Sequence, residues 1–294
     1  MINYWGKKSF MTIIIALCFC FITSPAAMAG YSVGFATNEI QIKSPPGNGT
    51  EVHGILPVSG TAKVDEVWFC VRGPKNEVEA QMATVSDGKF SIELTLRFGP
   101  GKYTIWAADN KTSFDGEIRF IAYNVVEDNR YTSASTYVDS NNAEIIKLSK
   151  SLVNENMTDI EKARVIHDWV AGNIEYDYQA YLAGDLGLKT ASVTLRDKSG
   201  LCGGYSFLFA ALCRAADIPA RVIQGKASGT DEWETQSHAW NEVMADGKWI
   251  PVDTTWDSGY IQDNQFVGSL SYKYFNPAPQ FFAKNYNGGK EMVY

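Results

Sequence analysis

The feature that most constrains this chain is a change of residue pattern near position 126. From about residue 31 to that point, short alternating or β-branched and aromatic runs are separated by Pro, Gly, Asn and Asp, as in strands joined by turns. Beyond it, apolar residues recur at helical spacing before strands return. A chain of 294 residues has room for about two domains. We therefore expect one domain at 30–125 and a second at 126–294.

The first of these domains reads as all-β. Its clearest strand candidates are residues 66–71, 89–96 and 102–107, and turn residues stand between them. Short strands at this spacing predict a β-sandwich. Residues 58–105 resemble bacterial immunoglobulin-like modules, which implies an immunoglobulin-like sandwich. Because the domain holds no catalytic constellation, we expect it to be a spacer or a substrate-presenting module.

The first 29 residues have the layout of a secretory signal peptide. Lys7 and Lys8 precede an apolar run at 10–22, and Ala27 and Ala29 are the small residues that a signal peptidase reads. The alternative is a membrane anchor, but the run of about 13 residues is shorter than the ~20 that span a bilayer. We expect cleavage after Ala29, no stable membrane anchor, and a secreted or cell-surface protein.

Composition and charge exclude some partners. Apolar residues make up 45% and charged residues 20% of the chain, which is an ordinary globular profile. Without Lys7 and Lys8, 24 of the 26 basic residues remain against 33 acidic ones, a net charge of −9. No basic run of the nucleic-acid-binding type is left, so we expect no nucleic-acid partner. Net charge would not attract the protein to a polyanionic cell wall either.

Three cysteines lie beyond the expected signal segment: Cys70, Cys202 and Cys213. An odd number leaves at least one free thiol. Cys202 and Cys213 fall on one expected helix, about 16 Å apart by helical rise, which is too far for a disulfide. A free thiol in an exported protein calls for a reason, and catalysis is one.

Helical patterns begin the second domain. Ile145, Leu148 and Leu152 form an apolar stripe over residues 141–153. Thr158 and Glu161 have the spacing of a capping box and should begin the next helix. Residues 175–200 are rich in Tyr, Gly and polar residues, so we expect a loop there, and a loop of that length is often functional.

Cys202 stands at the expected start of the following helix, with glycines on both sides at 200, 203 and 204. Unpaired N–H groups and the helix dipole favour an anion at such a position and lower a thiol pKa. The backbone N–H of Cys202 can also face a developing oxyanion. The plainer interpretation is a buried structural cysteine.

Strands are expected at 220–227, 238–245 and 248–254, and Asp246 and Gly247 form a hairpin signal between the last two. If these two residues are the turn, the numbers of paired residues sum to 493, and Trp240 faces Asp253. His238 lies on the same side as Trp240, roughly 7–8 Å diagonally from Asp253. An Asp beside a His fixes its tautomer. The plainer alternatives are a half-buried structural histidine and a strand-end cap.

Four segments, at 200–206, 212–222, 238–243 and 249–256, read GLCGGYS, LCRAADIPARV, HAWNEV and WIPVDTTW. In this order they resemble the transglutaminase-like superfamily, over about residues 140–280. The resemblance implies an α+β, papain-like core with Cys202 as nucleophile on a helix and His238 and Asp253 on adjacent strands. Residues 173–177 and 253–256 are most similar to bacterial secreted members and to the cytokinesis or kyphoscoliosis-type peptidase branch.

The resemblance leaves the second oxyanion donor unassigned. Tyr176, Tyr178 and Trp169 are the candidates, although the helical spacing of Trp169 favours a core position. We expect neither cofactor nor metal, because the chain has three histidines and no Cys-x-x-Cys motif.

The sequence is therefore best interpreted as a secreted cysteine acyl-transfer enzyme acting on peptide or glutamine carboxamides of a protein or peptide substrate, a cell-wall or surface protein among them. Whether water or an amine receives the acyl group stays open. One alternative is a non-catalytic surface-binding module with a vestigial site. Another is an amidase acting on cell-wall peptides.

Overall fold

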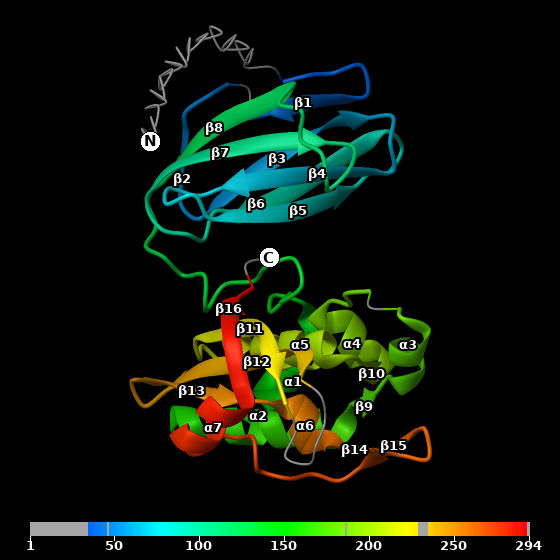
Figure 1. The fold of residues 1–294 in the computed structure, drawn as a ribbon. Coiled ribbons are helices and arrows are strands. Elements are labelled where there is room, and N and C mark those ends of the chain that lie inside the picture. The colour runs from blue at the N-terminus through cyan, green and yellow to red at the C-terminus, as the bar shows by residue number, and fades with distance from the viewer. Residues whose placement is uncertain (1–34, 46, 186, 229–234, 293–294) are drawn as a thin grey trace, which may run out of the picture.

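The computed structural model describes residues 35–45, 47–185, 187–228 and 235–292. Figure 1 shows an all-β part followed by a mixed α and β part. The expected signal segment, residues 1–29, lies outside the described residues. Among the residues that are described, no helix is long and apolar enough to cross a membrane. The predicted α+β class, with an all-β N-terminal part, is confirmed.

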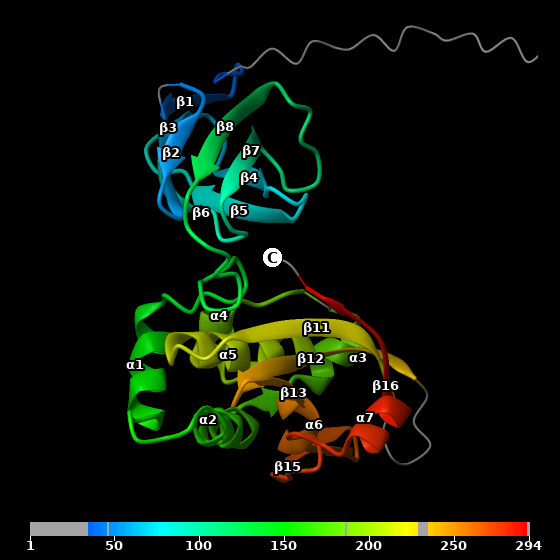
Figure 2. The same ribbon diagram turned by 90° about the vertical axis from the view of Figure 1, so that its left-hand side faces the viewer.

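Eight strands build the N-terminal part, in two sheets. One sheet has the order β1-β3-β6 and the other β2-β8-β7-β4-β5. Apolar residues from both sheets, Leu56 and Leu94 from the first and Phe69 and Phe120 from the second, share one core, as expected of a sandwich (Figure 2). The strands are β1 (Ile40–Ser44), β2 (Thr50–Val52), β3 (Ile55–Ala62), β4 (Glu66–Arg72), β5 (Val78–Thr84), β6 (Lys89–Thr95), β7 (Gly101–Ala108) and β8 (Ile118–Asn124).

Tyr103, near the start of β7, ties the strand to the loop before it. Its hydroxyl donates to the carbonyl of Gly99 at 3.0 Å and accepts from the N–H of Phe98 at 2.8 Å. A buried tyrosine bonded to backbone a few residues upstream is a corner found in immunoglobulin-type sandwiches. The immunoglobulin-like classification itself stays a prediction.

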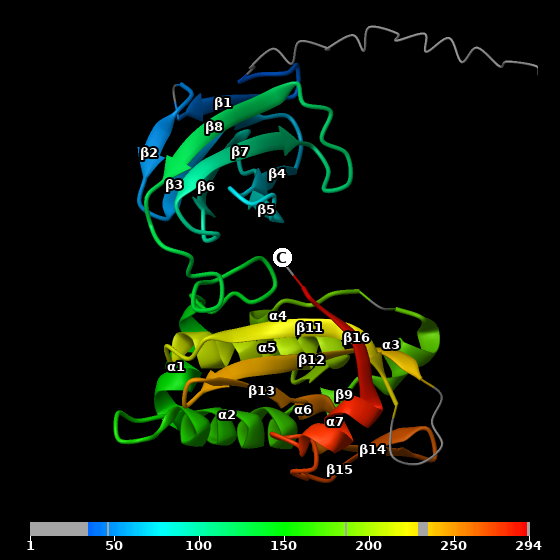
Figure 3. The same ribbon diagram turned by 60° about the vertical axis from the view of Figure 1, so that its left-hand side comes forward.

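The second part is built on a four-stranded antiparallel sheet with the order β13-β12-β11-β16. Figure 3 shows α5 running along this sheet, with α1 and α2 beyond it. The elements are α1 (Ala143–Leu152), α2 (Asp159–Asn173), β9 (Glu175–Tyr176), α3 (Tyr178–Ala183), α4 (Ala191–Asp197), β10 (Ser199–Gly200), α5 (Cys202–Ala215), β11 (Ala220–Ala227), β12 (Gln236–Ala245), β13 (Lys248–Val252), α6 (Thr254–Ser258), β14 (Gly259–Gln262), β15 (Gln265–Gly268), α7 (Pro279–Asn285) and β16 (Tyr286–Glu291).

Helix α5 lies at the centre of this domain. Every residue from Gly204 to Arg214 is buried, and its apolar side chains share one core with α1, α2 and the sheet. A helix that is apolar all round is expected in such a buried position. The predicted start at Cys202 is confirmed, and so is the capping box of α2, in which Thr158 and Glu161 each bond the other's backbone N–H.

The prediction of a loop over 175–200 is wrong. The segment contains two short helices, α3 and α4, and two short strands, β9 and β10. Asp177 and Thr190 accept hydrogen bonds from the first turns of α3 and α4, and Gly184 ends α3 in a left-handed conformation. Helices of six and seven residues are too short to show the periodicity that a window of 11–18 residues detects.

The hairpin prediction is confirmed in its turn and register. Asp246 and Gly247 both have positive φ, at 50° and 77°, as a two-residue type I′ turn requires. Asn241 pairs with Val252 and Ala245 with Lys248, which is the predicted sum of 493. The predicted end of the second strand at 254 is wrong, because β13 ends at Val252 and Asp253 caps α6 instead.

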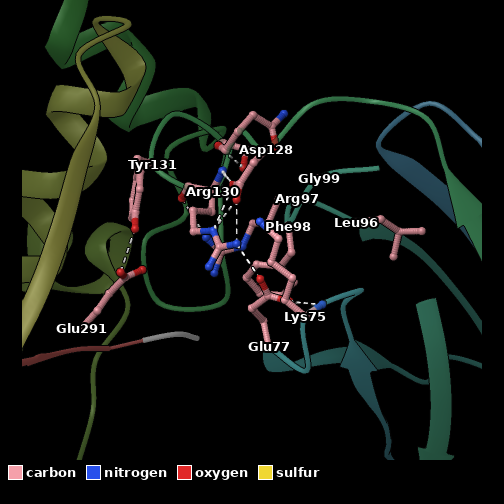
Figure 4. A network of polar contacts seen from close by, with 12 residues as sticks. Lys75, Glu77, Leu96, Arg97, Phe98, Gly99, Asp128, Arg130, Tyr131 and Glu291 are labelled. Atoms are coloured by element: carbon pink, nitrogen blue, oxygen red, sulfur yellow. Dashed lines mark hydrogen bonds and ion pairs between the residues drawn. The ribbon is translucent and has the colours of Figure 1, made fainter. Parts of the chain in front are cut away.

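A polar network joins the two domains through residues 128–131 (Figure 4). Arg97 of the β-part is buried in an ion pair with Glu79 at 2.8 Å, and it also donates to the carbonyl of Arg130 at 2.8 Å. Arg130 reaches back to Glu77 at 2.7 Å. On the other side, Tyr131 donates to Glu291 of β16 at 2.8 Å. The connecting segment is thus bonded to both domains.

Candidate active site

Cys202 is the first residue of α5 and is half-buried. The residue before it, Leu201, caps the helix with no side-chain hydrogen bond, so the first N–H groups of the helix remain available. Burial raises the pKa of the thiol, but a hydrogen bond from His238 and its charge outweigh burial, and the net result is a lowered pKa. A backbone hydrogen bond at Ala239 acts in the same direction.

The other described cysteines contrast with this one. Burial raises the pKa of the Cys70 thiol, and it does so strongly for Cys213, which lies in the core of α5. All three are free thiols. Because the thiolate is the nucleophilic form, Cys202 is the cysteine whose surroundings suit it for attack.

His238 comes from β12 and is buried. Its Nε2 lies 2.6 Å from Oδ2 of Asp253, which leaves Nδ1 as the ring nitrogen for the thiol. Burial lowers the pKa of the imidazole, but Asp253 and Cys202 raise it more, to about 10. The charged imidazolium is therefore favoured beside a thiolate.

Asp253 uses both of its carboxylate oxygens. Oδ1 accepts from the backbone N–H groups of Thr255 and Trp256, each at 3.1 Å, and so caps α6. Oδ2 accepts from His238 and from the hydroxyl of Tyr286, the latter at 2.7 Å. The structure thus brings together the three residues expected from the sequence, and Asp253 is both the partner of His238 and a helix cap.

Two aromatic side chains complete the surroundings of His238 and were not predicted. The ring of Trp256 stacks on the imidazole with 4.5 Å between ring centroids and 16° between planes. Tyr286 reaches Asp253 from β16, 33 residues further along the chain. Trp256 lies inside the 249–256 segment, so the pattern could have suggested it. Nothing in the local sequence marks Tyr286.

A second His–Asp pair braces the helix that Asp253 caps. His167 of α2 and Asp257 of α6 are both fully buried, with 3.0 Å between Nε2 and Oδ2. Asp257 also accepts from the backbone N–H of Tyr274, and the carbonyl of Tyr274 accepts from the N–H of Asp253 at 3.1 Å. The pair therefore links α2, α6 and the segment around Tyr274 behind the site.

The three candidates for the second oxyanion donor, Tyr176, Trp169 and Tyr178, differ in their surroundings. β9 pairs with β10 so that Tyr176 lies opposite Gly200, two residues before the thiol. Burial raises the pKa of Tyr176, and the next largest influence on it is the charge of Cys202. Trp169 instead packs under Lys198 at 4.2 Å and lines a different hollow of about 650 Å³ between α1, α2 and α4. Tyr178 stacks on Tyr181 of α3.

Within the described residues, no group of three or more His, Cys, Asp or Glu side chains is arranged to hold a metal ion. The absence of such a group leaves the metal and cofactor expectations as predictions.

Comparison with known proteins assigns part of the chain to a family model. Residues 146–254 match the sequence model of the transglutaminase-like superfamily. The chain contains a transglutaminase-like domain. The resemblance expected from the sequence is confirmed, and it joins this domain to a family of cysteine peptidases and acyltransferases. Tyr286 and β16 lie outside the matched range.

The transglutaminase-like domain also has curated relatives. It is 32% identical over 148 residues to the kyphoscoliosis peptidase of Homo sapiens and 31% identical to that of Mus musculus. Each match covers 48% of this chain and 22% of the relative. The chain thus spans about a fifth of the length of these relatives.

Two solved structures give weaker likenesses. A candidate cysteine protease from Cytophaga hutchinsonii shares 16% identity at a TM-score of 0.38, covering 81% of this chain and 86% of that one. Red sea bream transglutaminase shares 9% identity at a TM-score of 0.31, covering 75% and 50%. At these scores the whole-chain likeness has no bearing on function.

Proposed function

We propose that this protein is a cysteine acyl-transfer enzyme that attacks peptide or glutamine carboxamides through Cys202, His238 and Asp253. One observation carries the proposal: the Cys202 thiol, at a helix start, is hydrogen-bonded to an imidazole that is itself hydrogen-bonded to a buried carboxylate. A nucleophile, a base and a group that orients the base are the parts that such chemistry needs.

In the first step the thiolate of Cys202 attacks the carbonyl carbon and forms a C–S bond. The tetrahedral intermediate collapses as the C–N bond breaks, and the imidazolium of His238 gives its proton to the leaving amine. A thioester and a neutral imidazole remain. In the second step His238 takes a proton from water or from an amine, which attacks the thioester and regenerates the thiol.

The oxyanion formed in the first step needs two donors. The backbone N–H of Cys202, at the N-terminal end of α5, is the first. We assign the second to the hydroxyl of Tyr176, because the pairing of β9 with β10 places Tyr176 opposite Gly200, two residues before the thiol. Tyr176→Phe should lower kcat by about 10²-fold with little change in KM, and an unchanged kcat would remove Tyr176 from this role.

Asp253 supports both steps by holding the imidazole in place. Its Oδ2 holds Nε2 of His238, so that the ring presents Nδ1 to the thiol, and its charge stabilises the imidazolium. We further propose that the protein acts outside the cell on a protein or peptide, following the expected signal segment.

The decisive experiment is to incubate the purified protein with glutamine-containing peptides, with and without an added primary amine. Ammonia or an amine fragment is released in the first step whichever acceptor follows, so the acyl product decides: a new carboxylate, from glutamate or a new C-terminus, indicates hydrolysis, and incorporation of the added amine indicates transfer. Cys202→Ala should abolish both, whereas Cys70→Ala, at another half-buried cysteine, should leave both intact.

Activity that survives Cys202→Ala would refute the proposal. A protein that folds but shows no turnover on peptides or on purified cell-wall sacculi, with a thiol that labels no faster than free cysteine, would instead support the non-catalytic surface module. Release of stem-peptide fragments from sacculi alone would support the cell-wall amidase.

A further inference from the structure

An exposed apolar surface lies on α3 and the segment after it. Tyr181 is 44% exposed, Leu182 55% and Leu188 45%. Large apolar side chains that remain exposed together mark a place where a ligand or partner binds. Neither the thiol chemistry nor the packing of the core uses them.

This surface is continuous with the candidate active site. The ring of Tyr178 stacks on that of Tyr181 at 5.9 Å and 16°, and Tyr181 lies 6.4 Å from the ring of Tyr176. Tyr176 in turn lies opposite Gly200 in the β9–β10 pair, two residues before the thiol. We call Tyr176, Tyr178 and Tyr181 the tyrosine wall, and it extends from the exposed Tyr181 to the strand pair just before the thiol.

Leu188 borders the approach from the other direction. A Cβ built on Gly203, the residue after the nucleophile, would lie 3.5 Å from Cδ2 of Leu188. The leucine therefore lies over the first turn of α5. A substrate side chain next to a carbonyl at Cys202 would therefore come close to Leu188.

The wall is held in place by local bonds. The Asp177 carboxylate accepts from the N–H of Ala180 at 3.0 Å and so fixes the first turn of α3. Lys189 lies 3.8 Å from Asp177 and 3.4 Å from Asp197, which ties the segment after α3 back to α4. A surface that is preformed in this way binds a ligand without a large ordering cost.

We propose that the tyrosine wall and Leu188 form a specificity subsite that takes an aromatic side chain of the acyl-donor substrate. The proposal rests on the proposed function, since it names the substrate class of the same site. Two stacked phenol rings present flat faces, and aromatic rings gain from offset or edge contact with another ring beyond the burial of area.

The test is alkylation of Cys202, which needs the thiol but no turnover. Iodoacetamide and N-benzyl iodoacetamide are compared by their second-order rate constants, followed by mass spectrometry of the peptide that contains Cys202. The same ratio measured on glutathione corrects for intrinsic reactivity. In the wild-type protein we expect the benzyl reagent to be favoured by about tenfold after correction, as burial of one ring would give.

Tyr181→Ser and Leu188→Ser should each reduce this preference, the corrected ratio of the two rate constants, severalfold. Tyr181→Phe should keep it, because the ring and not the hydroxyl makes the contact. The matched control is Tyr123→Ser on β8, at a tyrosine that is 46% exposed and distant from the site, and it should keep the full preference.

A corrected ratio near one in the wild-type protein, or a preference that both serine variants retain, would overturn the subsite. These results leave the proposed function standing if peptides are still turned over. Conversely, a clear benzyl preference without any turnover would support the subsite and count against the enzyme. Both serine variants replace exposed side chains, and circular dichroism checks that they fold.

Discussion

At the scale of single residues, the carboxylate of Asp253 has two roles in the site. Its Oδ1 caps α6 and its Oδ2 holds His238 and Tyr286. Four donors on one buried carboxylate fix its plane and, with it, the plane of the imidazole. An alanine at this position would remove a helix cap and the orienting group together, so its effect on activity could not be assigned to either role.

Tyr286 can be tested more cleanly than Asp253. In Tyr286→Phe the ring contacts remain and only the hydroxyl is lost, so Oδ2 keeps His238 as its one side-chain donor. We expect the free energy of unfolding to fall by about 1–3 kcal/mol, as for a buried bond to a charged group. Without the tyrosine hydroxyl, the carboxylate should interact more strongly with the imidazolium and raise the pKa of His238. The alkaline limb of the kcat/KM profile should then move to higher pH.

Urea unfolding and a pH series of kcat/KM measure the two effects. Tyr260→Phe, at an exposed tyrosine of β14, is the control and should change neither. An unaltered pH profile with the stability loss alone would make Tyr286 a structural residue only.

The lowered pKa of Cys202 and the raised pKa of His238 predict how the alkylation rate and kcat/KM depend on pH. The thiolate is present above the lowered pKa of Cys202 and is lost as the pH falls through it, so the rate of alkylation should rise with a midpoint below the ordinary 9.0. The imidazolium is present below about pH 10 and is lost above it, so kcat/KM should fall on the alkaline side near that value.

In His238→Gln the burial of Cys202 remains but its cationic partner is gone. The midpoint of alkylation should therefore move above 9.0, because burial alone raises the pKa of a thiol. A midpoint that stays in place would show that the helix start, and not His238, stabilises the thiolate.

At the scale of elements, the short helix α6 positions the site. It has five residues, too few to be stable alone, and it is held by its cap at one end and by the bond of Asp257 to His167 of α2 at the other. Because Asp253 and Asp257 are on successive turns, the buried pair behind the site sets where the carboxylate in front of it lies.

Asp257→Asn keeps the size of the side chain but removes the charged acceptor from His167 and Tyr274. We expect a loss of about 2–4 kcal/mol in the free energy of unfolding, since buried groups are left without their partner. We also expect a lower kcat with KM little changed, because Asp253 shifts while the substrate surface of α3 does not.

The control for this variant is Asp263→Asn, at an exposed turn position between β14 and β15, which should leave both quantities unchanged. Full stability and full kcat in Asp257→Asn would contradict the positioning role of the pair.

At the scale of the whole molecule, the segment between the domains acts as a joint with bonds on both sides. Arg97 and Glu77 hold it from the β-part. On the other side, the carbonyl of Tyr131 accepts from the N–H of Ala220 at 2.9 Å, and Arg214 donates to the carbonyl of Ser133 at 2.9 Å. The connecting segment is therefore hydrogen-bonded to both parts of the protein.

Arg97→Ala should uncouple the domains. It leaves Glu79 buried without its cation, which typically costs about 3–5 kcal/mol, and it removes the bond to the linking segment. We expect one calorimetric transition in the wild-type protein and two in the variant, the β-domain melting first. Arg196→Ala, which breaks an exposed ion pair with Asp197, should keep the single transition. A single transition at an unchanged temperature in Arg97→Ala would show that this connecting segment does not couple the unfolding of the two domains.

Much of this protein was determined by local sequence patterns. The start of α5 at Cys202, the capping box at Thr158, the strand at 220–227 and the hairpin register through Asp246 and Gly247 all depend on residues a few positions apart. Turn and cap chemistry act over that distance, so the sequence alone could place Cys202 at a helix start and bring His238 to the face of Asp253.

Only the tertiary structure decided the rest. Tyr286 reaches Asp253 across 33 residues and His167 reaches Asp257 across 90, distances over which sequence periodicity carries no information. The short helices α3 and α4 escaped prediction because caps and packing, and not propensity over a long stretch, stabilise them. Local chemistry thus determined which groups could react, while long-range packing decided how the reacting groups are held and which side chains stand beside them.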